Sequence, residues 1–431
     1  MYGTVQVSRR SLEEHRPHAG DEVIEQLRSQ AVPLRGARVL NLTISPFGTG
    51  VADLLHGLVP LLRDLGLDVD WHVAGCTAES AHILRLIYAG LSGRRVEWTP
   101  EARENWHQYN KFNAELFEDR HDVVVVHEPQ LAGLREALAY RSPPVTQRAK
   151  WVWHCHLDLR GAQPEVLGDF LPALRGYDAW VLQDPAFAPQ APMSGPPVVI
   201  PPAIDPTCAR NLELPRESVR QFLHRNKLDP ARPVVVQVGP FDTSFDPIGV
   251  VDAYRRARQH RPDLQLLLVH SMSEASLEAW SRFERVARYV GSDPNVRVLC
   301  GQGDGRQVLV NAAQRAAHVV LQRSVPAGFS LSVWEGLWKG RPALVGAAGG
   351  LPLQVYDGVT GHLAQDEAGF VEGLLTLIDD PVRARRLGSN GRRMVRERHL
   401  ITRFLADELR LLRGLLSNAQ PDADKDVLLH A

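Results

Sequence analysis

Two histidines and an aspartate stand together at the end of one predicted strand. The run WVWHCHLDLR places His154 at the end of the apolar segment Lys150–His154, with His156 and Asp158 just beyond it. Imidazole and carboxylate groups at the carboxyl end of a parallel strand are placed to bind a ligand. One aspartate with an H-x-H spacing is a poorer set than zinc sites use, so the pattern favours a sugar or phosphate contact over a metal.

A second polar cluster follows the segment Asp122–His127, whose sequence is DVVVVH. Continuous β-branched residues are typical of a central strand in a parallel sheet. His127, Glu128 and Gln130 come where this strand ends, the place at which α/β domains put ligand-binding groups. For His127 taken alone, a hydrogen-bonded loop histidine without a ligand is the default interpretation.

The glycines Gly48 and Gly50 lie between an apolar segment, Ala37–Leu42, and a helical pattern over Val51–Leu65. In the order strand, glycine loop, helix, the backbone N–H groups and the helix N-terminus face an anionic ligand. A G-x-G spacing is weak evidence by itself, and a tight turn without a ligand explains it equally well.

The stretch His318–Leu363 has a similar layout in the second half of the chain. A predicted strand leads into the polar loop Gln322–Gly328, followed by a helix over Ser330–Lys339, a second strand and the glycine turn Gly349–Gly350. The polar residues gather at the carboxyl ends of the strands. This layout is typical of the nucleotide-binding half of an α/β fold.

Predicted strands alternate with predicted helices both before and after a Pro-rich segment of the sequence. That segment shows no hydrophobic periodicity. Such alternation predicts two parallel sheets flanked by helices, joined by a linker, with a cleft between their strand ends. The expected divisions are an arm and helix over 1–36, a first α/β domain over 37–200, a linker over 201–215, a second α/β domain over 216–395, a helix over 396–417 and a tail over 418–431.

The 431 residues carry 49 Lys and Arg against 50 Asp and Glu, a net charge of −1. This balance argues against a nucleic-acid-binding protein that relies on bulk positive charge. We find no apolar run long enough to span a bilayer and no targeting segment, so we expect no membrane contact. The four cysteines are far apart, which favours a reduced, cytoplasmic protein over one with a metal cluster.

Six segments carry a family likeness over about residues 30–415: GTGVADLLHGLVPLLRDLG, WVWHCHLDLR, AIDPTCARN, LVNAAQRAAHVVLQRS, VWEGLWKGRPAL and GGLPLQVYDGVTGHL. Through them the chain resembles the retaining glycosyltransferases of family 4, and among these the trehalose synthases and trehalose phosphorylases. The resemblance implies a GT-B fold, in which two Rossmann-like domains face each other across a cleft and C-terminal helices pack back towards the N-terminal domain.

The same resemblance implies a reaction and its partners. A glucosyl group would pass from a nucleotide-diphosphate sugar, held by the C-terminal half, to a small sugar acceptor in the N-terminal half, with retention of configuration. Neither a metal nor another cofactor is expected, and a homodimer stays open.

The resemblance also assigns roles to residues at matching positions. It implies that His156 lies near the reacting carbon of the donor sugar with Asp158 beside it, as catalytic residues, and that Glu335 holds the nucleotide ribose. The other expected donor-side residues are Gly48, Gly50, Arg323, Gly349, Gly350 and Leu351. The acceptor contacts expected in the N-terminal half are His127, Glu128 and Gln130.

Three positions depart from the family pattern. Pro240 and Phe245 stand where members usually have an arginine and a lysine that neutralise the diphosphate, and Ala327 stands where a glutamate meets the donor sugar. Two functions follow as hypotheses: an active hexosyltransferase with altered donor chemistry, or a catalytically degenerate relative that binds a sugar, a nucleotide or a partner without turnover. An α/β oxidoreductase is a weaker alternative, because no G-x-G-x-x-G follows a first strand with an acidic residue at the expected distance.

Overall fold

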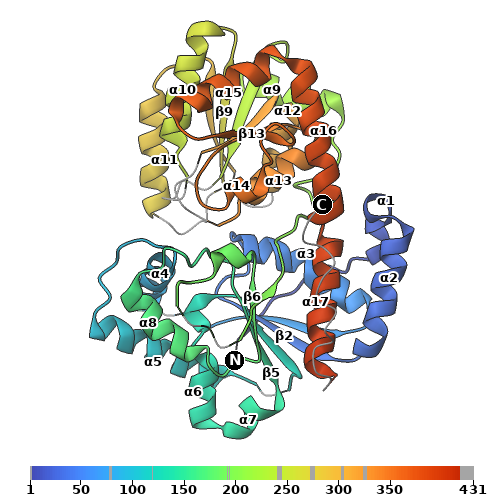
Figure 1. Ribbon diagram of the computed structural model, residues 1–431, viewed down its shortest axis with the longest axis vertical. Helices are drawn as coiled ribbons and strands as arrows, with labels where there is room; N and C mark the ends of the chain where they lie inside the picture. The colour runs from blue at the N-terminus through green and yellow to red at the C-terminus, as the bar shows by residue number, and fades with distance from the viewer. Residues whose placement is uncertain are drawn as a thin grey trace.

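The computed structural model describes residues 2–76, 80–118, 120–191, 193, 195–239, 245–271, 277–301, 305–323 and 328–417. These residues form two sheets flanked by helices, one above the other in Figure 1. Two of the positions that depart from the family pattern, Pro240 and Ala327, lie outside the described residues, as does the tail 418–431.

The first sheet has the strand order β1-β3-β2-β4-β5-β6-β7, and each neighbouring pair except β1 with β3 is parallel. Its central strands are buried on both faces, which is why their sequences are continuously apolar. The strands are β1 (Gly3–Thr4), β2 (Arg38–Thr43), β3 (Asp68–Val73), β4 (Val123–Val126), β5 (Lys150–His154), β6 (Ala179–Leu182) and β7 (Val198–Val199).

Helices cover both faces of this sheet. On one face, Trp106, Trp153 and Phe170 belong to one buried apolar cluster; on the other, Val152 belongs to a second cluster, because successive side chains of a strand alternate between faces. The helices and 3-10 turns of this half are η1 (Leu12–His15), α1 (Arg16–Ala19), α2 (Asp21–Ala31), η2 (Val32–Leu34), α3 (Gly50–Asp64), α4 (Ser80–Leu91), α5 (Pro100–Leu116), η3 (Pro129–Leu131), α6 (Leu134–Arg141), α7 (Pro143–Arg148), α8 (Pro164–Ala173) and η4 (Pro185–Phe187).

The second sheet has the order β10-β9-β8-β11-β12-β13, and all its pairs are parallel. Its strands are β8 (Val234–Val238), β9 (Gln265–Ser271), β10 (Val296–Gly301), β11 (Val319–Gln322), β12 (Ala343–Gly346) and β13 (Gly361–Ala364). Its helices are α9 (Arg216–Arg225), α10 (Pro247–His260), α11 (Leu277–Val290), α12 (Gly305–Ala316), α13 (Leu331–Trp338), α14 (Leu351–Gln354), α15 (Glu367–Asp379) and α16 (Pro381–Arg398).

The last helix, α17 (Ile401–Leu416), returns to the first sheet, as Figure 1 shows below α16. Its crossing point is pinned by Ile204, whose N–H donates to the His399 carbonyl at 2.8 Å and whose carbonyl accepts from the Ile401 N–H at 2.9 Å. Phe404 and its apolar neighbours on α17 then join the cluster that covers α2 and α3. The expected packing of C-terminal helices back towards the N-terminal domain is confirmed.

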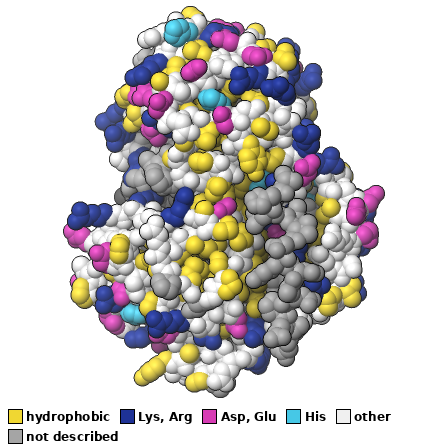
Figure 2. All heavy atoms as spheres, in the orientation of Figure 1, with side chains coloured by type: hydrophobic (Ala, Val, Ile, Leu, Met, Phe, Trp, Pro, Cys, Tyr) yellow, Lys and Arg dark blue, Asp and Glu magenta, His cyan; other side chains and the backbone are white. Residues whose placement is uncertain are grey.

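Lys and Arg side chains alternate with Asp and Glu side chains over the face drawn in Figure 2. Among the described side chains of this face, neither sign forms a broad continuous area, in keeping with the net charge of −1. Within the part of the chain that the structure describes, every helix is too short or too polar to cross a bilayer.

Glycines let α16 approach the second sheet closely. A Cβ atom at Gly388 would lie 2.1 Å from the carbonyl oxygen of Gly340, which is backbone and cannot swing away. We therefore expect Gly388→Ala to lower the free energy of unfolding by about 1–3 kcal/mol. Thermal unfolding measures this change. Gly414→Ala is the matched control, because Gly414 lies in a helix with open space around it and should gain about 0.5–1 kcal/mol. Equal effects of the two substitutions would contradict the close packing.

Candidate active site

Four polar side chains form a row at the carboxyl edge of the first sheet. Asn41 lies in β2, and His127, His156 and Gln183 follow β4, β5 and β6. Because the sheet order is β2-β4-β5-β6, the four residues stand in that order across the edge. The structure thus brings two of the predicted site residues, His127 and His156, next to each other.

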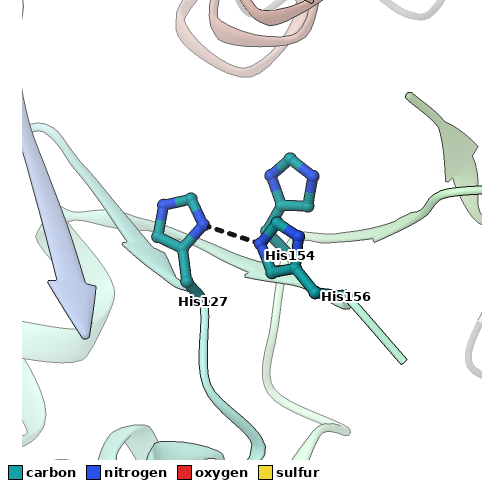
Figure 3. Close-up of side chains that lie close together, drawn as sticks. All are labelled: His127, His154 and His156. Atoms are coloured by element: carbon teal, nitrogen blue, oxygen red, sulfur yellow. Dashed lines mark hydrogen bonds between the residues drawn. The ribbon is translucent and has the colours of Figure 1, made fainter. Parts of the chain in front are cut away.

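Hydrogen bonds connect this row from end to end. His127 Nε2 lies 2.9 Å from Asn41 Oδ1, and His127 Nδ1 lies 3.1 Å from His156 Nε2. Gln183 Nε2 lies 3.5 Å from His156 Nδ1, at the long limit of a hydrogen bond. Figure 3 shows the contact between the two histidines as a dashed line.

His154 adds a third imidazole to this group (Figure 3). Its ring stacks on that of His156, with centroids 4.5 Å apart and planes 12° apart, and on that of Phe404 of α17, at 5.7 Å and 7°. Its Nδ1 lies 3.3 Å from Glu408 Oε1, also on α17. The C-terminal helix α17 therefore contacts this histidine group through His154.

One ring nitrogen from each of the three histidines lies within 4.8 Å of those of the other two, close enough to suggest a metal site. Metal-binding imidazoles point their in-plane lone pairs at one ion about 2.0–2.1 Å away. Here the rings of His154 and His156 are nearly parallel, so their lone pairs run side by side and do not converge. The arrangement suits hydrogen bonding among the rings, and the expectation of no metal stays a prediction.

Burial holds the pKa of His127 and of His156 well below the usual value of an imidazole, and the neighbouring His154 lowers it further. Both rings are therefore neutral at pH 7. A neutral imidazole has one N–H donor and one acceptor nitrogen, which is what a continuous chain of hydrogen bonds requires.

The other two expected acceptor contacts, Glu128 and Gln130, are also buried, with 6% and 3% of their surface exposed. Gln130 Nε2 donates to the Leu84 carbonyl at 3.2 Å, a contact inside the first domain. His127 likewise uses both of its nitrogens within the domain. This hydrogen bonding agrees with the default interpretation of His127, and the acceptor-binding role of the three residues stays a prediction.

Burial raises the pKa of Glu128 to about 8, so this carboxyl is protonated in the fold at neutral pH. The contribution of Glu128 to the free energy of unfolding is fully present below about pH 4.3, the pKa of a glutamate in the unfolded chain. It is lost as the pH rises through 8, the pKa in the fold. We expect Glu128→Gln, which cannot ionise, to melt at a higher temperature than the native protein at about pH 8.5. The difference in melting temperature should be smaller at about pH 5, where the native carboxyl is still protonated in the fold.

Melting temperatures at the two pH values measure this margin. Glu165→Gln is the matched control, because Glu165 is exposed and its substitution should shift both melting temperatures equally. A margin for Glu128→Gln that does not change with pH would show that the carboxyl ionises normally.

Asp158 lies beside His156 and joins the two domains through Arg160. Asp158 Oδ2 lies 2.6 Å from Arg160 Nη2, and the same guanidinium donates to the Gly349 carbonyl at 3.2 Å. Arg160 also lies over the ring of Phe187, 5.3 Å from its centroid. Arg160 was missed by the sequence reasoning, although it ends the quoted run WVWHCHLDLR.

The expected donor-side glycines occupy tight or left-handed positions. Gly48 and Gly349 have φ values of 81° and 59°, a region that favours glycine. A Cβ atom at Gly350 would lie 2.9 Å from the carbonyl of Gly328, and one at Gly50 would lie 3.7 Å from Leu331 of α13. Each glycine loop therefore lies at the interface between the domains, since a Cβ atom at Gly350 would also lie 2.9 Å from Phe187 of the first domain. Leu351, which follows, is buried.

The predicted donor contact Arg323 is already paired. Its Nε lies 2.9 Å from Asp246 Oδ2, at the N-terminus of α10. The adjacent Phe245 turns its ring towards Gly239, so closely that a Cβ atom there would lie 2.3 Å from it. An uncharged aromatic ring thus stands at the end of β8, where the family resemblance implies a cation.

Glu335 lies apart from the histidines, at a cavity of about 260 Å³ between the domains. Its Oε1 lies 3.0 Å from Arg210 Nε, and its Oε2 is buried without a hydrogen-bond partner. Arg210 Nη1 lies 3.1 Å from Asp53 Oδ2 of α3, so this linker arginine connects the two domains. Sequence reasoning missed Arg210, although it lies in the quoted segment AIDPTCARN.

Two family models match the chain: "Trehalose synthase, N-terminal domain" over residues 41–189 and "Glycosyl transferases group 1" over residues 219–394. The chain is 34% identical to the trehalose synthase of Thermococcus litoralis over 403 residues, which cover 93% of this chain and 96% of that protein. It is also 34% identical to the trehalose synthase of Rubrobacter xylanophilus, over 96% of this chain and all of that protein. The chain belongs to the trehalose synthase family.

The fold is likewise similar to that of a solved structure. An α,α-trehalose-phosphate synthase (UDP-forming) from Burkholderia xenovorans, in complex with glucose-6-phosphate, is similar with a TM-score of 0.69. The two share 15% identity, over 88% of this chain and 100% of that one. The expected GT-B fold and the resemblance to trehalose-synthase-like glycosyltransferases are confirmed.

Proposed function

We propose that this protein transfers a glucosyl group from a nucleotide-diphosphate sugar to a small sugar acceptor, with retention of configuration. The observation that carries this proposal is how the two domains face each other. A Cβ atom at Gly328 of the second domain would lie 3.8 Å from the backbone N of Asp158 and the carbonyl oxygen of His156. The segment expected to lie beside the reacting carbon therefore packs against the second domain, which is expected to hold the donor.

In this mechanism each group acts where charge develops. As the bond between the glucosyl carbon and the phosphate oxygen breaks, negative charge grows on the phosphate, and backbone N–H groups of the Gly349–Gly350 loop stabilise it. The neutral ring of His156 contacts the sugar. The unpartnered Oε2 of Glu335 accepts a hydrogen bond from a hydroxyl group of the ribose. The acceptor hydroxyl attacks from the face that the phosphate leaves and gives its proton to the departing phosphate oxygen, so configuration is retained.

Contacts between the domains exclude water from this reaction. Phe187 of the first domain packs on Phe329 of the second, with ring centroids 5.0 Å apart, and Arg160 contacts the Gly349 carbonyl. Exclusion of water strengthens electrostatic stabilisation and prevents hydrolysis of the donor. We place the enzyme in the cytoplasm, in keeping with the free thiols of Cys155 and Cys208, and we expect it to use no metal or other cofactor.

Product analysis with a panel of donors tests the proposal. The protein is incubated with UDP-, ADP- or GDP-glucose plus glucose, and separately with trehalose plus phosphate or a nucleoside diphosphate. We expect trehalose to form from at least one donor, or its cleavage in the reverse direction. The absence of product with every donor, together with measurable ligand binding by calorimetry, would contradict the proposal and support the catalytically degenerate alternative.

A further inference from the structure

We propose that Asn41 and His127 are positioning residues that fix the tautomer of His156 and so decide which of its ring nitrogens is offered to the donor sugar. The inference rests on the proposed role of His156 beside that sugar. Its structural basis is the row Asn41–His127–His156–Gln183, in which each residue comes from the next strand of the sheet.

Asn41 determines the direction in which hydrogen bonds are donated along this row. Its Oδ1 faces His127 Nε2 at 2.9 Å, and an amide oxygen only accepts, so the proton of neutral His127 lies on Nε2. His127 Nδ1 is then an acceptor, and the partner 3.1 Å away, His156 Nε2, must donate to it. His156 Nδ1 consequently carries a lone pair and no proton.

This lone pair faces the side-chain amide of Gln183. Gln183 Nε2, its neighbour in the row, is 3.5 Å away, the longest contact of the three. The other atom of the same amide, Gln183 Oε1, would lie 3.8 Å from a Cβ atom at Gly328, so the amide stands between His156 Nδ1 and the second domain. A hydroxyl group of the donor sugar therefore reaches the lone pair of His156 Nδ1 by replacing Gln183 Nε2 at this long contact.

Without the hydrogen bonds of this row, His156 would have no fixed tautomer. The two neutral forms of an imidazole interconvert, and only the form with a bare Nδ1 accepts a proton from a hydroxyl at that atom. Burial keeps water from replacing His127, which has 2% of its surface exposed. The remaining groups around the row are His154, stacked on His156 at 4.5 Å, and Glu408, which faces His154 and not His156.

Nitrogen-15 NMR of the full-length protein labelled at histidine tests the proposed tautomers of the row independently of catalysis. We expect His127 and His156 to show the neutral form protonated at Nε2, with a coupling across the bond between His156 Nε2 and His127 Nδ1. In Asn41→Leu we expect His127 to lose this single form. A native His156 protonated at Nδ1, or a stoichiometric metal bound to the three histidines, would overturn the proposal.

Kinetics separate positioning from a merely structural role. We expect His127→Leu to lower kcat by about 10–100-fold, the usual cost of losing a group that orients a functional imidazole, with little change in KM. His127→Asn should recover most of kcat, because its Oδ1 stands near the lost Nδ1 and accepts the same proton. His121→Leu is the matched control: His121 is buried in the same domain and bonded to Asp70, outside the row.

The outcomes distinguish the two proposals. If the native protein shows no turnover, the proposed function fails, and the NMR measurement still decides whether the tautomer is fixed. If turnover is present and both His127 variants lose kcat equally, or if His121→Leu loses as much as His127→Leu, the loss is structural and the positioning role is wrong. If His127→Leu does not fold, the native spectrum and the comparison of His127→Asn with the native enzyme decide.

Discussion

Returning the three departing positions to the family residues, as Pro240→Arg, Phe245→Lys and Ala327→Glu, is expected to raise kcat/KM for glucosyl transfer by at least about 100-fold. One well-placed donor to a developing negative charge is worth about 10²–10³-fold in rate. Phe245 offers no such donor at the end of β8, and the nearby Arg323 is held by Asp246. Added cations should therefore lower the barrier to departure of the diphosphate.

Initial rates with each nucleotide glucose measure this gain. Phe245→Lys alone should give part of it, and Phe245→Gln is its control, because glutamine adds polarity without charge. A fall in an existing activity after the triple substitution would contradict the expectation. It would show that the native site stabilises the diphosphate by groups other than the three restored residues.

Arg210→Leu is expected to lower the free energy of unfolding by about 3–5 kcal/mol, the typical cost of removing one partner of a buried ion pair. The substitution removes the arginine that pairs with Glu335, whose side chain is 5% exposed. It also removes the nearer of two arginines from Asp53, which is 25% exposed and keeps Arg306 at 3.9 Å. Because Asp53 reaches water, we expect the lower end of this range. Denaturant or thermal unfolding measures the loss.

A double-mutant cycle shows whether the loss comes from the unpaired charge. Glu335→Leu added to Arg210→Leu should restore part of the stability, because no buried carboxylate is then left opposite the missing arginine. Arg288→Leu is the matched control, since Arg288 pairs with Glu284 on the surface and such pairs contribute about 0–1 kcal/mol. Additive losses in the cycle would show that Arg210 and Glu335 do not interact.

Regular elements with strong periodicity could be predicted from the sequence. The strand Lys150–His154 and the strand Ala343–Gly346 have the predicted bounds, and Val123–Val126 lies inside its prediction. The strand Gly361–Ala364 was missed, because four residues that include a glycine and a histidine show no period. The helix Leu134–Arg141 was missed for a similar reason: it is short, and only Leu134 and Leu138 are buried.

The candidate site could be predicted in part, for a physical reason. Strand ends of a parallel sheet meet at one edge, so His127 and His156 could be placed near each other from sequence alone. The order of the strands could not, and it is this order that puts Asn41 and Gln183 into the same row. Arg210 was missed because its contacts with Asp53 and Glu335 join segments far apart in sequence, and no local pattern records them.

The return of α17 to the first sheet has a consequence for synthesis on the ribosome. The apolar cluster that covers α2 and α3 is completed by side chains near the end of the chain, among them Phe404 and Leu412. While the ribosome is still making the second domain, the first therefore exposes an apolar face that has no cover. Such nascent states are prone to aggregation, so the emergence of α17 from the ribosome becomes the step that completes the domain made first.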